Sequence, residues 1–151
     1  MANFTIPDVG KKYLLELKLG NPDGISPAPT NLGAAKFHLA DPSSTYTAAP
    51  RDQLLGDFVE CTFAGYAAQN AFPWSGLVYD STNHWWYSYS KVAVFTSTDA
   101  AASHNTSGWY LTDGGTNYLI AFIQYSPVVT IPILGSIAVQ AQMDELSQYN
   151  N

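Results

Sequence analysis

The chain has 151 residues, of which 46% are hydrophobic and only 12% are charged, and its net charge is −6. This length and composition predict one folded domain over residues 1–151 and exclude a disordered polymer. Four of the six Lys and Arg residues lie before residue 37, so no basic patch can be assembled, and we expect neither nucleic acid nor a membrane among the partners.

The first predicted element is a helix from Pro7 to Leu19. Pro7 suits the first helical position, and Gly20 is a natural residue to follow the last turn. Residues 13–19 also alternate as a strand would, but the stop signals favour the helix. An apolar stripe at helical spacing supports it, made of Val9, Tyr13, Leu14 and Leu17. We assign residues 1–20 to an N-terminal arm and helix.

Most of the remaining chain carries β-forming residues between turn signals, which predicts many short strands. The predicted strands span residues 35–39, 58–63, 74–79, 84–90, 91–98, 109–111, 117–124 and 136–143. The segment 91–98 either continues the strand before it or forms its neighbour. The expected fold class is therefore all-β, a β-sandwich or barrel that includes a jelly-roll-like arrangement, with one short N-terminal helix.

Turn and loop signals separate these strands. Two turns and a kink are predicted, at residues 41–44, 112–116 and Gly65. Residues 21–31 and 48–55 are expected to be irregular, and residues 99–107 are expected to form a polar turn without core positions. Prolines 127 and 132 confine residues 128–133 to a sheet edge or a break. The polar tail 144–151 is expected to be flexible.

The predicted strand 58–63 holds the single cysteine of the chain. Alternation places Phe58, Glu60 and Thr62 on one face and Val59, Cys61 and Phe63 on the other. A lone cysteine beside apolar residues of the same face is typical of a buried, inert thiol. No intrachain disulfide and no cysteine-based metal site can form.

The sequence contains no recognisable catalytic motif. The histidines, His38, His84 and His104, lack metal-ligand spacing, and a nucleophile elbow and a phosphate-binding loop are both absent. Asp57 and Glu60 are expected on opposite faces of a strand, although a glycosidase needs two converging carboxylates. We therefore expect no enzymatic activity, no cofactor and no metal, and a small hydrolase with Glu60 or Asp80 in a cleft is the weakest hypothesis.

An aromatic run in the predicted strand 84–90 provides the candidate contact residues. They are Trp85, Trp86, Tyr87 and Tyr89. In a strand, Trp85, Tyr87 and Tyr89 share one face and Trp86 takes the other. If the three form a flat exposed row, they favour carbohydrate binding; if a second copy covers them, they favour assembly. Trp and Tyr on a weakly charged surface suit subunit contacts.

The order of several segments resembles small virion-associated structural proteins of tailed bacteriophages. The segments that carry the resemblance are residues 6–10, 36–39 and 55–67, Trp74, residues 107–114 and 121–122, and the terminal alternating strand. Residues 82–107 depart from the pattern. The resemblance implies a capsid decoration (cement) protein, or a small protein of the tail or neck, without catalytic groups.

This resemblance also implies partners and a location. The expected partners are the major capsid protein or neighbouring virion proteins and further copies of the chain, as a dimer or trimer. Residues 1–6 and 144–151 are candidate arms that order on a neighbour. Because no secretory signal or apolar span is visible, we expect synthesis in the host cytoplasm and a final place in the virion. A carbohydrate- or receptor-binding module of a tail or fibre is the alternative.

Overall fold

The computed structural model describes residues 5–10, 32–82, 85–114 and 118–144. Most of the predicted helix, the loop 21–31, His84 and the tail beyond Asp144 lie outside these residues. Asp8, Val9 and Gly10 are helical, as the start of the predicted helix requires. Asp144, which was assigned to the flexible tail, instead has its backbone in the last described strand, paired with Tyr87.

Antiparallel strands make up most of the regular secondary structure of the described residues, which confirms the predicted all-β class. The strands are β1 Lys36–Ala40, β2 Gln69–Asn70, β3 Val78–Asp80, β4 Trp85–Tyr89, β5 Ala93–Thr96, β6 His104–Thr112, β7 Leu119–Ile131, β8 Ser136–Val139 and β9 Gln142–Asp144. Three single 3₁₀ turns accompany them: η1 Leu32–Ala34, η2 Pro50–Asp52 and η3 Leu55–Asp57. No helix among the described residues is long and apolar enough to cross a membrane.

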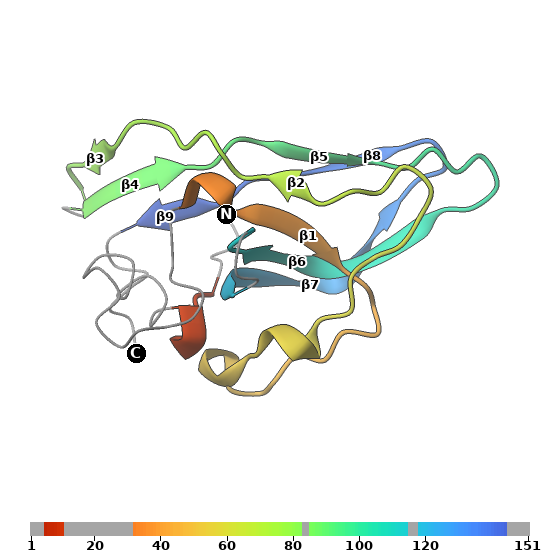
Figure 1. The fold of residues 1–151 in the computed structure, drawn as a ribbon, viewed down its shortest axis with the longest axis horizontal. Coiled ribbons are helices and arrows are strands. Elements are labelled where there is room, and N and C mark those ends of the chain that lie inside the picture. The colour runs from red at the N-terminus through yellow and green to blue at the C-terminus, as the bar shows by residue number, and fades with distance from the viewer. Residues whose placement is uncertain (1–4, 11–31, 83–84, 115–117, 145–151) are drawn as a thin grey trace.

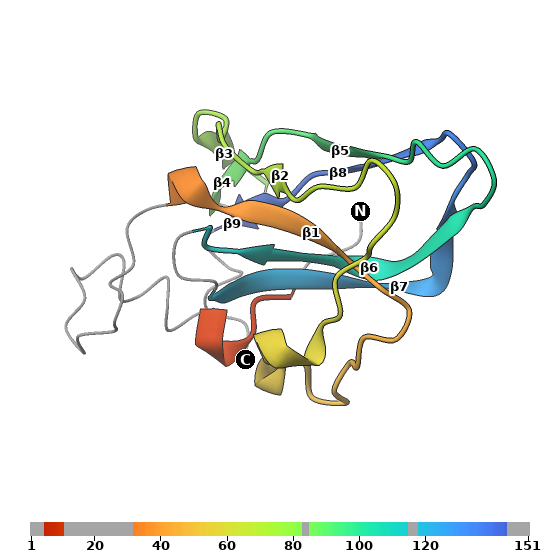
Figure 2. The same cartoon turned by 45° about the vertical axis from the view of Figure 1, so that its right-hand side comes forward.

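The strands form two layers (Figure 1). One layer is the sheet β2-β1-β6-β7, and the other holds the sheets β3-β4-β9 and β5-β8. Figure 2 shows that β4 leads into β5 and β8 into β9, so that the second layer is one long twisted ribbon. Ala71 joins the layers at one edge, because its N–H donates to Ala35 O and its carbonyl accepts from Lys91 N, each at 2.9 Å.

The main core fills the space between the layers. Alternate residues of β1 and β6 point into it, as a pleated strand requires, and they meet the inward face of β5 and β8. Its members include Phe37, Leu39, Phe95, Trp109, Leu111 and Val139. Phe37 and Trp109 pack edge to face with ring centroids 5.0 Å apart, a favourable aromatic geometry.

A smaller core covers the outer face of the four-stranded sheet. Ala40, Tyr110, Leu119 and Phe122 are buried there under side chains of the 41–60 segment. The N-terminal segment pairs with the edge strand β7 of this sheet, because Thr5 and Phe122 exchange two backbone hydrogen bonds of 2.8 and 2.9 Å, and Ile6 is buried in the main core. Thus both faces of the sheet are apolar, and the loop that follows β1 is a structural cover.

The structure corrects two of the predicted strands. Residues 58–63 make a single bridge, Ala40 with Glu60, so the predicted strand is wrong, although Phe58 and Cys61 do point to opposite faces as predicted. Phe58 turns into the smaller core, Cys61 lies in the main core, and Val59 is 48% exposed. In place of the predicted strand 74–79 the structure has the shorter β3, and before it Ser75 N donates to Tyr89 O, at the end of β4, at 2.7 Å.

The polar segment 99–107 is also corrected. It was expected to hold no core position, yet β6 begins at His104, and Thr106 and Ser107 are buried. Their hydroxyl groups can be buried because they donate to backbone carbonyls: Thr106 Oγ1 to Ala40 O at 2.8 Å and Ser107 Oγ to Asp41 O at 2.8 Å. A satisfied hydroxyl makes a polar residue acceptable in a core.

The C-terminal half agrees more closely with prediction. β6 and β7 form the expected antiparallel pair, and β7 lies at the end of the sheet order, where Pro127 is tolerated. The predicted strand 136–143 is divided into β8 and β9 at Gln140 and Ala141, while Val139 and Ala141 face the core as expected.

Candidate functional site

The aromatic run occupies β4, in the middle of the sheet β3-β4-β9. The register pairs Tyr79 with Trp86 and Val78 with Tyr87. Tyr79 and Trp86 therefore share one face, with ring centroids 5.1 Å apart, and they are 47% and 49% exposed. Trp86 and Tyr79 thus form an exposed aromatic pair whose rings are tilted by 47°.

Tyr87 and Tyr89 lie on the opposite face from Trp86, as the predicted alternation requires. Their rings meet edge to face at 5.3 Å and both are only partly exposed, so these two tyrosines do not form a flat platform. The side chain of Trp85 lies outside the described residues. Among the described aromatic side chains of β4, Trp86 is therefore the most exposed. It is also the residue that the predicted alternation places on the face opposite to the other three.

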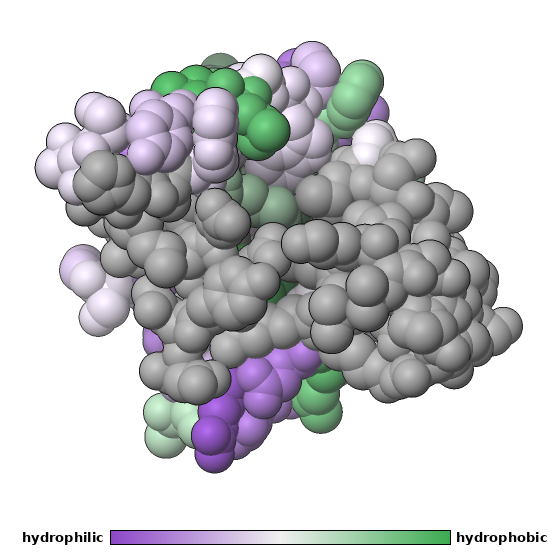
Figure 3. Space-filling model, turned by 90° about the vertical axis from the view of Figure 1, so that its left-hand side faces the viewer, coloured by the Kyte–Doolittle hydropathy of each residue, from purple (hydrophilic) through white to green (hydrophobic). Residues whose placement is uncertain are grey.

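Apolar exposure continues along β3 beside the aromatic pair. Leu77 is 71% exposed and Val78 is 42% exposed. By alternation Leu77 shares the face of Tyr79 and Trp86, and we call these three residues the β3–β4 patch, whereas Val78 lies with Tyr87 on the opposite face. Figure 3 views the molecule from this end: weakly polar residues in pale violet gather at the top beside green apolar ones, and strongly hydrophilic residues lie at the bottom.

A second exposed apolar region lies at the other end of the molecule, where β7 leads into β8 (Figure 1). It consists of Ile133 and Leu134 in the turn, which are 49% and 62% exposed, and of Val128 and Val129 on the two opposite faces of β7, which are 47% and 37% exposed. We call these residues the β7–β8 patch. Sequence reasoning missed it, although one signal was present: no charged residue or histidine occurs between Asp113 and Asp144.

Three polar side chains on the outer face of the four-stranded sheet lie in the order of a catalytic triad. His38 Nδ1 is 2.8 Å from Glu60 Oε1, and His38 Nε2 is 2.9 Å from Thr112 Oγ1. Because a carboxylate only accepts, Nδ1–H donates to Glu60, and in the neutral ring Nε2 accepts from the hydroxyl of Thr112.

This row has a structural role. Thr112 is 2% exposed, so its hydroxyl cannot meet a substrate, and His38 stacks on Tyr110 with ring centroids 4.8 Å apart. Tyr66 also donates to Glu60 Oε1, at 2.7 Å, and accepts from Leu39 N at 3.1 Å. The network therefore holds residues 60–66 against β1. The backbone pairing there is one bridge, so these side chains supply most of the attachment.

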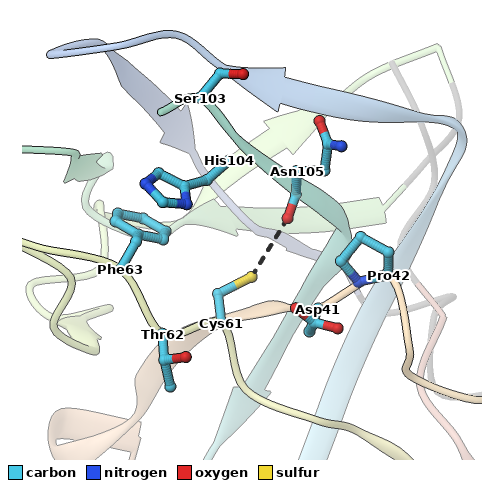
Figure 4. Close-up of a pocket in the computed structure, with 8 residues that line it drawn as sticks. All are labelled: Asp41, Pro42, Cys61, Thr62, Phe63, Ser103, His104 and Asn105. Carbon is cyan, nitrogen blue, oxygen red and sulfur yellow. Dashed lines mark hydrogen bonds between the residues drawn. The ribbon is translucent and has the colours of Figure 1, made fainter. Parts of the chain in front are cut away.

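A pocket of about 260 Å³ opens beside the single cysteine (Figure 4). Its lining comprises Asp41, Pro42, Cys61, Thr62, Phe63, Ser103, His104 and Asn105. Figure 4 shows the ring of His104 lying against Phe63, and their centroids are 4.9 Å apart. The second partner of His104 is Asp99, with Nε2 and Oδ2 3.2 Å apart.

The chemistry of Cys61 does not suit a nucleophile. The pKa of its thiol is raised to about 11, mainly by burial; a hydrogen bond with Thr106 lowers this pKa, and the charges of Asp41 and Glu60 raise it. Its Sγ donates weakly to the carbonyl of Asn105, at 3.8 Å. A catalytic cysteine needs a lowered pKa, so Cys61 agrees with the predicted buried thiol.

The remaining sequence candidates are engaged in local structure. Asp57 Oδ2 accepts from Leu54 N at 2.8 Å and from Gln53 Nε2 at 3.0 Å, while Asp80 Oδ1 accepts from Thr82 N at 2.8 Å. Within the described residues, no group of three His, Cys, Asp or Glu side chains could hold a metal ion.

No protein-family model, curated protein or solved structure matches this chain. The function therefore has to be argued from the two patches and from the polar groups just described.

Proposed function

We propose that this protein is a non-enzymatic virion structural protein, namely a decoration protein that stabilises the head of a tailed bacteriophage through subunit contacts. The observation that carries the proposal is the pair of exposed apolar patches at opposite ends of a weakly charged body. Contiguous exposed apolar surface is typical of protein interaction sites, and interface cores are depleted of charge.

Two patches at opposite ends suit a subunit that bridges neighbours. One patch can bind the major capsid protein or another virion protein while the other binds a further copy, in a dimer or trimer. The triad-like row supports the non-enzymatic part of the proposal, because His38, Glu60 and Thr112 hydrogen-bond to one another and hold the fold together. The resemblance of the sequence to virion proteins supplies the phage context, with synthesis in the host cytoplasm, and the proposal requires no cofactor, nucleic acid or membrane.

Quantitative mass spectrometry of purified phage particles tests the proposal. We expect a copy number in fixed ratio to the major capsid protein. A copy number far below that of the capsid protein would reject decoration and indicate the neck, tail or fibre. Absence from the particle would reject the virion role altogether.

The exposed pair of Trp86 and Tyr79 supports a second candidate, a carbohydrate- or receptor-binding module of a tail or fibre. Aromatic faces can pack on the C–H faces of sugars. If this candidate is correct, purified host surface polysaccharide quenches tryptophan fluorescence, Trp86→Ala abolishes the quenching, and the matched exposed substitution Val94→Ala does not. A wild-type protein whose emission is unchanged by the polysaccharide would reject it.

A further inference from the structure

The pocket beside Cys61 lies at the end of the molecule opposite to β3 and β4, where β1 ends and β6 begins (Figure 1). Three segments of the chain form it: Asp41 and Pro42 after β1, residues 61–63, and residues 103–105. Its volume is about 260 Å³. A cavity of about 150 Å³ already holds benzene, so the pocket has room for one planar side-chain group and part of its aliphatic stem.

Two stacked rings form one wall of this pocket. The rings of Phe63 and His104 have centroids 4.9 Å apart and an interplanar angle of 18°. Figure 4 shows both rings on one side of Cys61 and the ring of Pro42 on the other side. The lining is therefore apolar and aromatic beside the buried thiol, and a planar cation packs on such rings better than a compact one does.

His104 and Asp41 each leave one acceptor available to a ligand. His104 Nε2 is 3.2 Å from Asp99 Oδ2, and because a carboxylate only accepts, Nε2–H donates. In the neutral ring Nδ1 is then an acceptor, and no described residue donates to it. The Oδ1 atom of Asp41 accepts from Ser43 N and Ser43 Oγ, at 2.9 and 2.6 Å. Its Oδ2 atom has no donor among the described residues.

The charge at the pocket is negative. Asp41 belongs to the lining, Asp99 is bound to His104, and Glu60 precedes Cys61 in the chain. Besides burial, which is the main cause, the charges of Asp41 and Glu60 raise the pKa of the Cys61 thiol, so both carboxylates act on the pocket. No lysine or arginine of the described chain lines it. The pocket therefore favours a cation over an anion or a neutral group.

A guanidinium group matches these features together. It is planar, always charged and carries five N–H donors but no acceptor, so it can donate to a carboxylate and to a ring nitrogen at once. Its flat face packs on aromatic rings. A lysine ammonium supplies the charge but not the flat face. Arginine is also enriched in protein interfaces and among their most important residues.

We propose that the pocket beside Cys61 binds an arginine side chain of a partner protein in the virion, with its guanidinium group between the Asp41 carboxylate and Nδ1 of His104. The proposal rests on the proposed function, for which it names the chemistry of the partner at one contact. It predicts an exposed arginine on the major capsid protein, or on another virion protein that binds this chain.

A titration of the ¹⁵N-labelled chain, followed by the NMR signals of its backbone amides, tests the contact. The probe is Nα-acetyl-arginine amide, and the control probe is Nα-acetyl-citrulline amide, which has nearly the same shape without the charge. We expect the arginine probe to shift the signals of residues 61–63 and 103–105 saturably, with a Kd of about 1 mM, as a single side chain provides. The citrulline probe should bind at least about tenfold more weakly.

Two matched variants separate the pocket from the net charge. Asp41→Asn should weaken binding of the arginine probe by about tenfold, and it should keep the turn, because the asparagine Oδ1 also accepts from Ser43. Asp80→Asn removes the same charge from a similar turn at the other end of the molecule, where Asp80 Oδ1 accepts from Thr82 N at 2.8 Å. It should leave binding of the probe unchanged.

Three results would overturn the proposal: equal binding of the two probes, no saturable shift of the pocket signals with the arginine probe, or equal losses in Asp41→Asn and Asp80→Asn. The first two use the wild-type chain, so they decide even where a variant does not fold. Failure here is distinguishable from failure of the proposed function. A chain that is abundant in particles but does not bind the arginine probe rejects only the pocket contact. A chain that binds the probe but is absent from particles rejects only the virion role.

Discussion

At the scale of single residues, the main core depends on a few large side chains from the central strands. Trp109 is 2% exposed and contacts Phe37 edge to face, at the centre of the sheet that both cores share. Trp86, in contrast, is 49% exposed. The same residue type therefore has a structural role in β6 and is available for contacts in β4.

Replacing Trp109 with alanine should lower the free energy of unfolding by about 3–5 kcal/mol, because it removes a buried aromatic side chain and leaves a cavity. Urea denaturation followed by circular dichroism measures the change. Trp86→Ala is the control and should cost less than about 1 kcal/mol, as exposed substitutions usually do. Equal losses for the two variants would contradict the assignment of Trp109 to the core.

Sequence patterns predicted the apolar residues of this core better than its polar ones. Cys61 was expected inside and is buried, because apolar character alone favours burial. Thr106 and Ser107 were missed, since their burial depends on carbonyl groups of residues 40 and 41. Partners that distant in the sequence are visible only once the chain is folded. The hydrogen-bonded row of Thr112, His38 and Glu60 could not be predicted from the sequence for the same reason.

At the scale of elements, the close approach of β6 and β7 depends on Gly108. A Cβ atom added to Gly108 would lie 1.9 Å from the carbonyl oxygen of Ile123 and 2.7 Å from the hydroxyl of Tyr46. The first neighbour is backbone in the paired strand, so it cannot rotate away. Gly108 also follows the register shift in the β6–β7 ladder, where the two strands change their pairing.

Gly108→Ala should therefore force β6 and β7 apart and destabilise the protein by at least about 3 kcal/mol, as overpacking against rigid neighbours does. Gly76→Ala offers a matched control, because nothing lies within 4 Å of the corresponding Cβ position. The melting temperatures of both variants, measured by thermal unfolding, test this prediction. A melting temperature of Gly108→Ala close to that of Gly76→Ala would show that the strands can separate without cost.

The prediction of elements succeeded where local signals were strong. The β6–β7 hairpin has Asp-Gly at its turn and β-forming residues on both sides, and it is present. The segment 58–63 keeps its alternation, with Phe58 in the smaller core and Cys61 in the main core, but it fails as a strand because it pairs with β1 at one bridge, between Ala40 and Glu60. An alternating sequence indicates an extended backbone, but how many of its residues pair depends on how far a neighbouring strand runs beside it in the folded chain.

At the scale of the whole molecule, several buried acidic protons should make the fold sensitive to alkali. Burial raises the pKa of Cys61 to about 11 from 9.0 and that of Tyr125 to about 12 from 10.0. Burial is also the main reason that the pKa values of Tyr46, Tyr66 and Tyr110 are raised. In each case the unfolded chain loses its proton at lower pH than the folded chain.

Because a raised pKa stabilises the folded state only while the unfolded group stays protonated, stability should be constant below pH 9.0 and fall above it. The urea midpoint measured from neutral to alkaline pH tests this expectation. Cys61→Ala should flatten the first part of the decline, between pH 9.0 and 10.0, before the tyrosines of the unfolded chain begin to ionise. A midpoint that rises with pH over this range would contradict it.

The bridge between Thr5 and Phe122 has a consequence for how the protein is made. Thr5 is synthesised 117 residues before its pairing partner, Phe122. β1 likewise waits for β6. At about 5–20 residues per second, the early segment spends several seconds or more without its strand partner. The four-stranded sheet must therefore close late in synthesis, and chaperones have time to bind the apolar N-terminal residues before the fold covers them.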